Sequence, residues 1–156
     1  MKRAILLPFI LFVSAGAVTA QSADKDKAEV LAVVTRMFDG MREADSTKVR
    51  SVFDAGARFS SARTREGKTT ISYDAVDGWL AGIAKSNRQW EERIFDTEVR
   101  VDGNIASVWT RYNFYLNGAL RHCGVDSMEL LKTESGWKVT QLADTQQREG
   151  CRPEAK

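Results

Sequence analysis

The chain has 156 residues, of which 43% are hydrophobic, 23 are basic and 21 are acidic. Lys2 and Arg3 are the only charged residues among the first 20, so the other 136 residues carry equal numbers of basic and acidic side chains. A neutral chain of this size gives no electrostatic reason to expect a nucleic-acid or membrane partner, and it is long enough for one domain with its own core.

Residues 1–20 have the layout of a cleavable secretory signal. Two basic residues precede an apolar run over residues 4–13, which is about half of the roughly 20 residues needed to span a bilayer. Val18 and Ala20 suit the −3 and −1 positions of a cleavage site. We therefore predict a single domain over residues 21–156 that is periplasmic or secreted, with an uncleaved anchor as the alternative.

Three helices are predicted from the spacing of apolar residues. The first covers residues 24–44, and its apolar stripe consists of Val30, Val33, Val34, Met37, Phe38 and Met41. Asp45 and Ser46 indicate the N-cap of a short second helix over residues 47–54. A third helix is expected over residues 74–85, with Asp74 as its cap.

Alternating and β-branched segments predict the strands. Two short strands are expected at residues 57–61 and 69–73, on either side of a charged loop. Four longer strands follow the third helix, joined by Asp102-Gly103, Asn117-Gly118 and Ser135-Gly136 as turns, at residues 89–101, 105–116, 120–132 and 137–145. This order predicts an α+β fold in which helices pack on one face of a curved antiparallel sheet.

The Asn117-Gly118 turn sets the expected register of the central hairpin. As a two-residue loop it pairs Asn113 with His122 and Arg111 with Gly124. Alternation then gathers a mixed polar set on one face, namely Trp109, Arg111, Asn113, Tyr115, His122, Gly124 and Asp126. A β-bulge would exchange the faces partway along a strand.

His122 and Asp126 are the candidate catalytic residues. In a pocket, the ordinary pKa of His122 would suit general acid–base chemistry near neutral pH; at the end of a hairpin it would be a solvated side chain instead. Aspartate is depleted in strands, so the position of Asp126 within a predicted strand indicates a specific role. It is either a pocket base with a raised pKa or the ion-pair partner of Arg111.

Four further residues are candidate ligand contacts. Arg111 could bind an anion, or pair with Asp126. Tyr112 could donate its hydroxyl into a pocket, or belong to the core with a solvated tip. Trp109 could form an apolar wall, and Asp144 could join Asp126 or cap the edge of the sheet.

Cys123 and Cys151 are the only cysteines, and in an exported protein they indicate a disulfide. Two buried thiols or a bond between chains are the alternatives. The expected last hairpin places Cys123 opposite residue 148, so the tail has to fold back for a bond to form. The chain has no Cys-x-x-Cys motif and a single histidine, so neither a metal site nor a cofactor is expected.

The segment from Gly103 to Cys151 contains GNIASVWTRYNFYLNG, HCGVDSMELLK and GWKVTQLADT. Together with the helical start and residues 53–59, it resembles the nuclear-transport-factor-2-like superfamily, and within it the SnoaL-like and lumazine-binding-like small domains. The resemblance implies a cone-shaped, cystatin-like α+β roll, in which a strongly bent sheet wraps the helices and leaves a pocket open at one end.

That superfamily includes isomerases, dehydratases, cyclases, ligand-binding proteins and proteins that only bind partners, so the fold does not select a function. Our leading hypothesis is an exported domain that binds a small, partly apolar molecule. The alternatives are an isomerase-, dehydratase- or cyclase-type enzyme without a cofactor, using Asp126 or His122 as base, and a non-catalytic dimeric interaction module. A homodimer through the sheet is a further hypothesis, since both faces carry aromatic residues. An open cone with an unpaired acid at its floor would favour the enzyme.

Overall fold

The computed structural model describes residues 16–152, so the first 15 residues of the predicted signal lie outside the described part. The helices and strands follow in the order α1 (Gly16–Arg42), α2 (Ser46–Arg50), β1 (Phe53–Arg65), β2 (Lys68–Ala75), α3 (Val76–Lys85), β3 (Trp90–Asp102), β4 (Ile105–Leu116), β5 (Ala119–Thr133) and β6 (Gly136–Gln146). Within residues 16–152, no helix is both long and apolar enough to cross a membrane.

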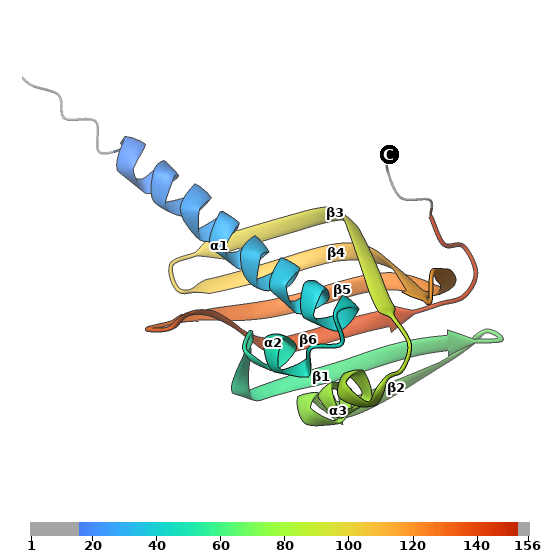
Figure 1. Ribbon diagram of the computed structural model, residues 1–156. Coiled ribbons are helices and arrows are strands. Elements are labelled where there is room, and N and C mark those ends of the chain that lie inside the picture. Colours follow the sequence, from blue (N-terminus) through green and yellow to red (C-terminus); the bar gives the residue numbers. More distant parts are fainter. Residues whose placement is uncertain (1–15, 153–156) are drawn as a thin grey trace, which may run out of the picture.

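The six strands form one curved, open sheet in the order β2-β1-β6-β5-β4-β3. β1 pairs with β6 in parallel, and every other neighbouring pair is antiparallel. All three helices lie on the same side of the sheet, with α1 crossing its concave face (Figure 1). The predicted α+β roll is confirmed.

The apolar stripe of α1 forms the core against the concave face of the sheet. Val30, Val34 and Met37 are completely buried, and they belong to one cluster with Met128 and Leu130 of β5. Burial of each such side chain contributes about 1.5–3 kcal/mol, so this face fixes the helix on the sheet. The predicted stripe is confirmed.

The segment after α1 differs from the prediction in its boundaries. Asp45 caps α2 as expected, since its carboxylate accepts the backbone N–H of Lys48 at 2.8 Å. However, β1 begins at Phe53, and it continues with β2 into a long hairpin because Glu66 and Gly67 both adopt positive φ in a tight turn. The turn thus lies within the expected charged loop, but the rest of that loop is strand, and Asp74 lies in β2 without capping α3.

The central hairpin contains the most consequential difference. Asn117 and Gly118 form the predicted turn, with φ of 51° and 76°. Arg121, however, is an extra residue in β5, since Phe114 pairs with His122 while Tyr115 pairs with Leu120. This bulge shifts the register by one and exchanges the faces of the rest of β5.

The predicted pairings of Asn113 with His122 and of Arg111 with Gly124 are consequently wrong. Asn113 pairs with Cys123, and Arg111 pairs with Val125. Because residues directly opposite each other point to the same side, Arg111 and Asp126 lie on opposite faces of the sheet. The expected ion pair between them is not formed.

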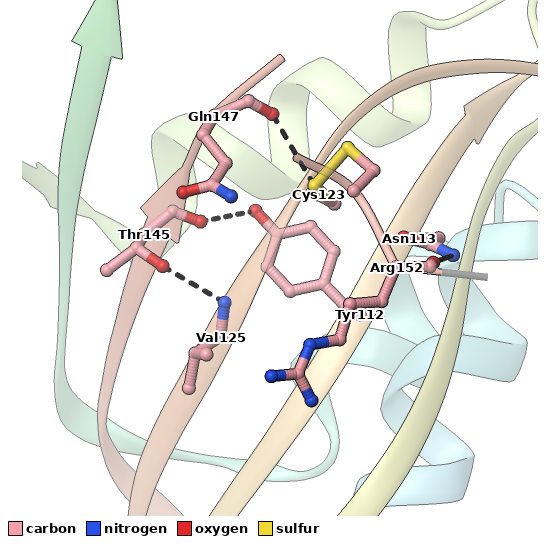
Figure 2. The surroundings of a disulfide bond; sticks show 8 residues. Tyr112, Asn113, Cys123, Val125, Thr145, Gln147 and Arg152 are labelled. Carbon is pink, nitrogen blue, oxygen red and sulfur yellow. Dashed lines mark hydrogen bonds between the residues drawn. A yellow bond between two sulfur atoms is a disulfide. The ribbon is translucent and has the colours of Figure 1, made fainter. Parts of the chain in front are cut away.

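The last hairpin turns at Glu134 and Ser135, and a second bulge at Thr140 adjusts its register so that Cys123 lies opposite Gln147. The backbone groups of these two residues exchange two hydrogen bonds of 2.9 Å. The tail then folds back, as Figure 2 shows, and Cys151 forms the predicted disulfide with Cys123, with 5.6 Å between their Cα atoms. The disulfide is confirmed.

We expect Cys151→Ser to destabilise the domain. The bond closes a loop across a sequence separation of 28 residues, for which the chain-entropy model gives roughly 3–4 kcal/mol. Urea unfolding of the variant should show a lower midpoint than the oxidised protein. Fully reduced wild-type protein should have the same urea midpoint as the variant. Equal midpoints for oxidised and reduced wild-type protein would contradict the expectation.

Candidate functional site

A cavity of about 650 Å³ lies between helices α1 and α3 and the concave face of the sheet. It is bounded at one end by residues from the end of β1, the end of β4 and the start of β3. Apolar and aromatic side chains form about half of its lining, the rest being polar or charged; the apolar ones are Met37, Phe38, Met41, Phe59, Trp79, Trp90, Phe114, Leu116 and Leu142.

A row of four buried polar residues crosses the sheet at the inner end of this cavity. Strand pairing aligns Ser61 of β1, Asp144 of β6, Asp126 of β5 and Thr110 of β4, and we call these four the polar row. None of the four is more than 8% exposed, and the two aspartates line the cavity. The next row inward is apolar, consisting of Phe59, Leu142, Met128 and Val108. The two aspartates of the polar row thus form the polar floor of the cavity, where it meets the core.

The two aspartates of the polar row have different partners. Oδ2 of Asp144 accepts hydrogen bonds from Gln146 at 2.8 Å and from the Tyr112 hydroxyl at 3.2 Å. Asp126 forms no ion pair or side-chain hydrogen bond with a described residue, and its Oδ2 is buried without a partner. Arg111 cannot neutralise it, because its Nε lies 3.7 Å from Asp96 on the other face.

Two carboxyl groups of the cavity, those of Asp126 and Glu92, favour their protonated forms. Burial, together with the negative charges of Glu92 and Asp144, raises the pKa of Asp126 well above its ordinary value. Burial and the charge of Asp144 likewise raise the pKa of Glu92 on β3 to about 8. Asp144 differs from these two groups in accepting hydrogen bonds from Tyr112 and Gln146.

His122 lines the same cavity as an uncharged ring. It stacks on Phe114, with 4.6 Å between ring centres, and meets the edge of Tyr112 at 5.8 Å. Burial lowers its pKa to about 4, and the positive charges of Arg63 and Arg148 act in the same direction. The His122 ring is therefore neutral at pH 7, although the charge of Asp144 acts against the shift.

Gly124 allows a backbone carbonyl to enter this region. A Cβ atom at residue 124 would lie 1.7 Å from the carbonyl oxygen of Thr145, so no other residue fits without moving the strand. That carbonyl accepts the Tyr112 hydroxyl at 2.8 Å, while the Thr145 hydroxyl accepts the N–H of Val125 at 3.0 Å (Figure 2). The end of β6 is thereby fixed behind the polar row.

Comparison with known proteins supports the expected family. A family model described as "Putative lumazine-binding" matches residues 25–142. The chain belongs to this lumazine-binding-like family, within the nuclear-transport-factor-2-like superfamily. No curated protein matches the sequence significantly.

Several solved structures share this lumazine-binding-like fold. A cystatin-like protein of the superfamily from Novosphingobium aromaticivorans is 11% identical, with a TM-score of 0.70 over 89% of this chain and 92% of that one. A protein of unknown function from Shewanella baltica is 18% identical, with a TM-score of 0.61 over 80% and 95%. A Streptomyces avermitilis protein described as a "putative dehydratase" is 19% identical, with a TM-score of 0.60 over 80% and 97%. At these identities the similarity concerns the fold.

The cavity brings together three of the six candidate residues, Asp126, His122 and Asp144. Tyr112 is buried directly behind them and contacts Asp144. Trp109 and Arg111 lie on the convex face instead, where Trp109 is 51% exposed. Trp109 therefore does not line this cavity, because the bulge at Arg121 separates its face from that of Asp126; it lines hollows on the convex face instead.

Glu92 was not among the candidate residues predicted from the sequence, because no expected register placed it on a face. The available signal was its alternation with Trp90 and Ile94, since all three share one side of β3. The convex face also exposes Ile71 and Tyr73 beside Trp109. A homodimer through this face stays a prediction.

Protonation of Glu92 should make the stability of the domain depend on pH. Its native pKa of about 8 exceeds the ordinary 4.5, so the folded state holds a proton that the unfolded chain releases. Stability should therefore fall as pH rises from 4.5 to 8, with uptake of up to about one proton on folding. Glu92→Gln should flatten this dependence in urea unfolding series. Glu134→Gln, at an exposed turn, serves as the control; identical pH profiles for both variants would exclude the shift.

Proposed function

We propose that this lumazine-binding-like domain binds a small, partly apolar molecule in its cone. The cavity of about 650 Å³, with aromatic walls and a polar floor, is the observation that supports this proposal. The protonated carboxyl groups of Asp126 and Glu92 would donate hydrogen bonds to acceptor atoms of the ligand, such as a carbonyl oxygen. The family description agrees with a role in ligand binding.

We propose further that the protein is exported to the periplasm or secreted. The signal-like residues 1–20 and the disulfide between Cys123 and Cys151 support this location. The protein recovered from its native compartment should then begin at Gln21; an intact N-terminus would rule out the cleavage.

Ligand binding is tested with N-phenyl-1-naphthylamine, a neutral aromatic probe that fluoresces in apolar sites. Gly82 lines the cavity from α3, whereas Gly78, one turn earlier on the same helix, faces open space. Gly82→Leu should fill the cavity and weaken probe binding at least about tenfold, as burial of the probe is lost. Gly78→Leu should bind like wild type. Equal binding by both variants would mean that the probe does not occupy the cone.

A second candidate is an acid–base enzyme of the isomerase, dehydratase or cyclase type, with Asp126 as the acting group. The supporting observation is that Asp126 faces the cavity without a neutralising cation. A carboxyl group with a raised pKa can release or accept a proton near neutral pH, which is what such reactions require. The dehydratase description of one structural neighbour points in the same direction.

A generic proton-abstraction probe, 5-nitrobenzisoxazole, tests this second function. A base removes the C3 proton, and the electron pair breaks the N–O bond to release 2-cyano-4-nitrophenolate, which absorbs visible light. We expect the rate to increase with pH as Asp126 ionises, and Asp126→Asn to reduce it by about a hundredfold or more. The rate of the Glu92→Gln variant distinguishes a contribution of Glu92 from that of Asp126. If Asp126→Asn does not change the rate, the enzyme hypothesis fails and ligand binding without catalysis is the remaining function.

A further inference from the structure

Four of the residues that line the cavity are basic and exposed, and we call them the basic rim: Arg63, Arg65, Lys85 and Arg88. The first two end strand β1, Lys85 ends helix α3, and Arg88 lies in the segment that leads to β3. These ends of β1 and α3 lie toward the same side of the molecule in Figure 1. Two separate parts of the chain thus bring positive charge to one cavity.

The basic rim has no protein partner within residues 16–152. None of its four side chains forms an ion pair or a hydrogen bond with a described residue, whereas Arg42 and Lys48 have carboxylate partners at 2.7 and 2.9 Å. Like charges around one opening repel each other, so their collection there is not explained by stability. Their charge remains available to a bound anion.

The interior of the cavity does not cancel this charge. Its acidic lining residues are Glu92, Asp126 and Asp144. The raised pKa values of the first two reduce their negative charge at neutral pH, and even three ionised carboxylates would be outnumbered by the four residues of the basic rim. The cavity is therefore net positive, and a cleft with low-dielectric walls concentrates such a field.

Two aromatic pairs complete the lining. Phe59 of β1 stacks on Trp79 of α3, with 5.8 Å between ring centres and 20° between planes. Trp90 of β3 meets the edge of Phe114 on β4 at 6.0 Å. Because β1 and β3 are far apart in the strand order, the two pairs form opposite walls. Such walls suit a flat, apolar ligand body.

We propose that the cavity binds an amphipathic organic anion, whose aromatic body lies between the two aromatic pairs and whose acid group contacts the basic rim. This inference rests on the proposed ligand binding and specifies the class of ligand. The reverse orientation is unfavourable, because an acid group at the floor would meet the charge of Asp144 and two further carboxyl groups. A neutral acceptor at the far end of the ligand would suit the floor.

Two probes with the same rings isolate the role of charge. 1-Anilinonaphthalene-8-sulfonate is N-phenyl-1-naphthylamine with one added sulfonate. The double variant Arg63→Gln/Arg88→Gln should weaken the anionic probe about tenfold, since charge-assisted hydrogen bonds are lost. Binding of the neutral probe should change by less than about twofold, because the walls are intact. Added salt should weaken only the anionic probe.

Arg100→Gln provides the matched control, because Arg100 is an exposed arginine on β3 that does not line this cavity. It should leave both affinities unchanged. The inference is overturned if the double variant weakens both probes equally, or if it leaves the anionic probe unaffected while Gly82→Leu still abolishes neutral-probe binding. If Gly82→Leu affects neither probe, it is the proposed binding function that fails.

Discussion

The burial of carboxyl groups across the middle of the concave face is the constraint on which the rest of the structure depends. On the core side of the polar row, the concave face of the sheet must be apolar to hold α1. On the other side of the row, the same face lines the cavity. Asp126 and Asp144 lie directly opposite each other in neighbouring strands, where two negative charges would repel strongly. Retention of a proton relieves this repulsion, so the geometry that closes the core also produces a buried acid.

Strand irregularities determine which side chains reach that face. The bulge at Arg121 places Asp126 inside the cone and Arg111 outside it. On β3, Asp96 and Thr97 form another bulge, after which the Thr97 hydroxyl lies 2.7 Å from that of Thr110. The Thr110 hydroxyl thereby has a hydrogen-bond partner on β3, and it does not pair with the neighbouring Asp126. Without the first bulge, Arg111 would share a face with Asp126 and could form the ion pair expected from sequence.

Much of the fold was predictable because it follows from local patterns. The stripe from Val30 to Met41 has helical spacing, and Asn117-Gly118 requires a tight turn, so the buried face of α1 and the turn of the β4–β5 hairpin were predicted correctly, although α1 begins at Gly16. The faces of the sheet were not predictable, because a single extra residue reverses them and Arg121 has no distinctive side chain that marks a bulge. The positions of Glu92 and the basic rim at the cavity depend on how distant segments of the chain pack together, and the periodicity of the sequence carries no information about that packing.

The segment His122–Asp126 shows how closely the back of the sheet supports the floor of the cavity. Alternation sends His122, Gly124 and Asp126 inward and Cys123 outward, so one short stretch contacts both sides. Inside, the missing side chain of Gly124 admits the Thr145 carbonyl that accepts the Tyr112 hydroxyl. Outside, Cys123 binds the tail just beyond the end of β6. The disulfide therefore restrains the strand end that supplies both Asp144 and the Thr145 carbonyl, and it links the stability of the tail to the position of the buried acids.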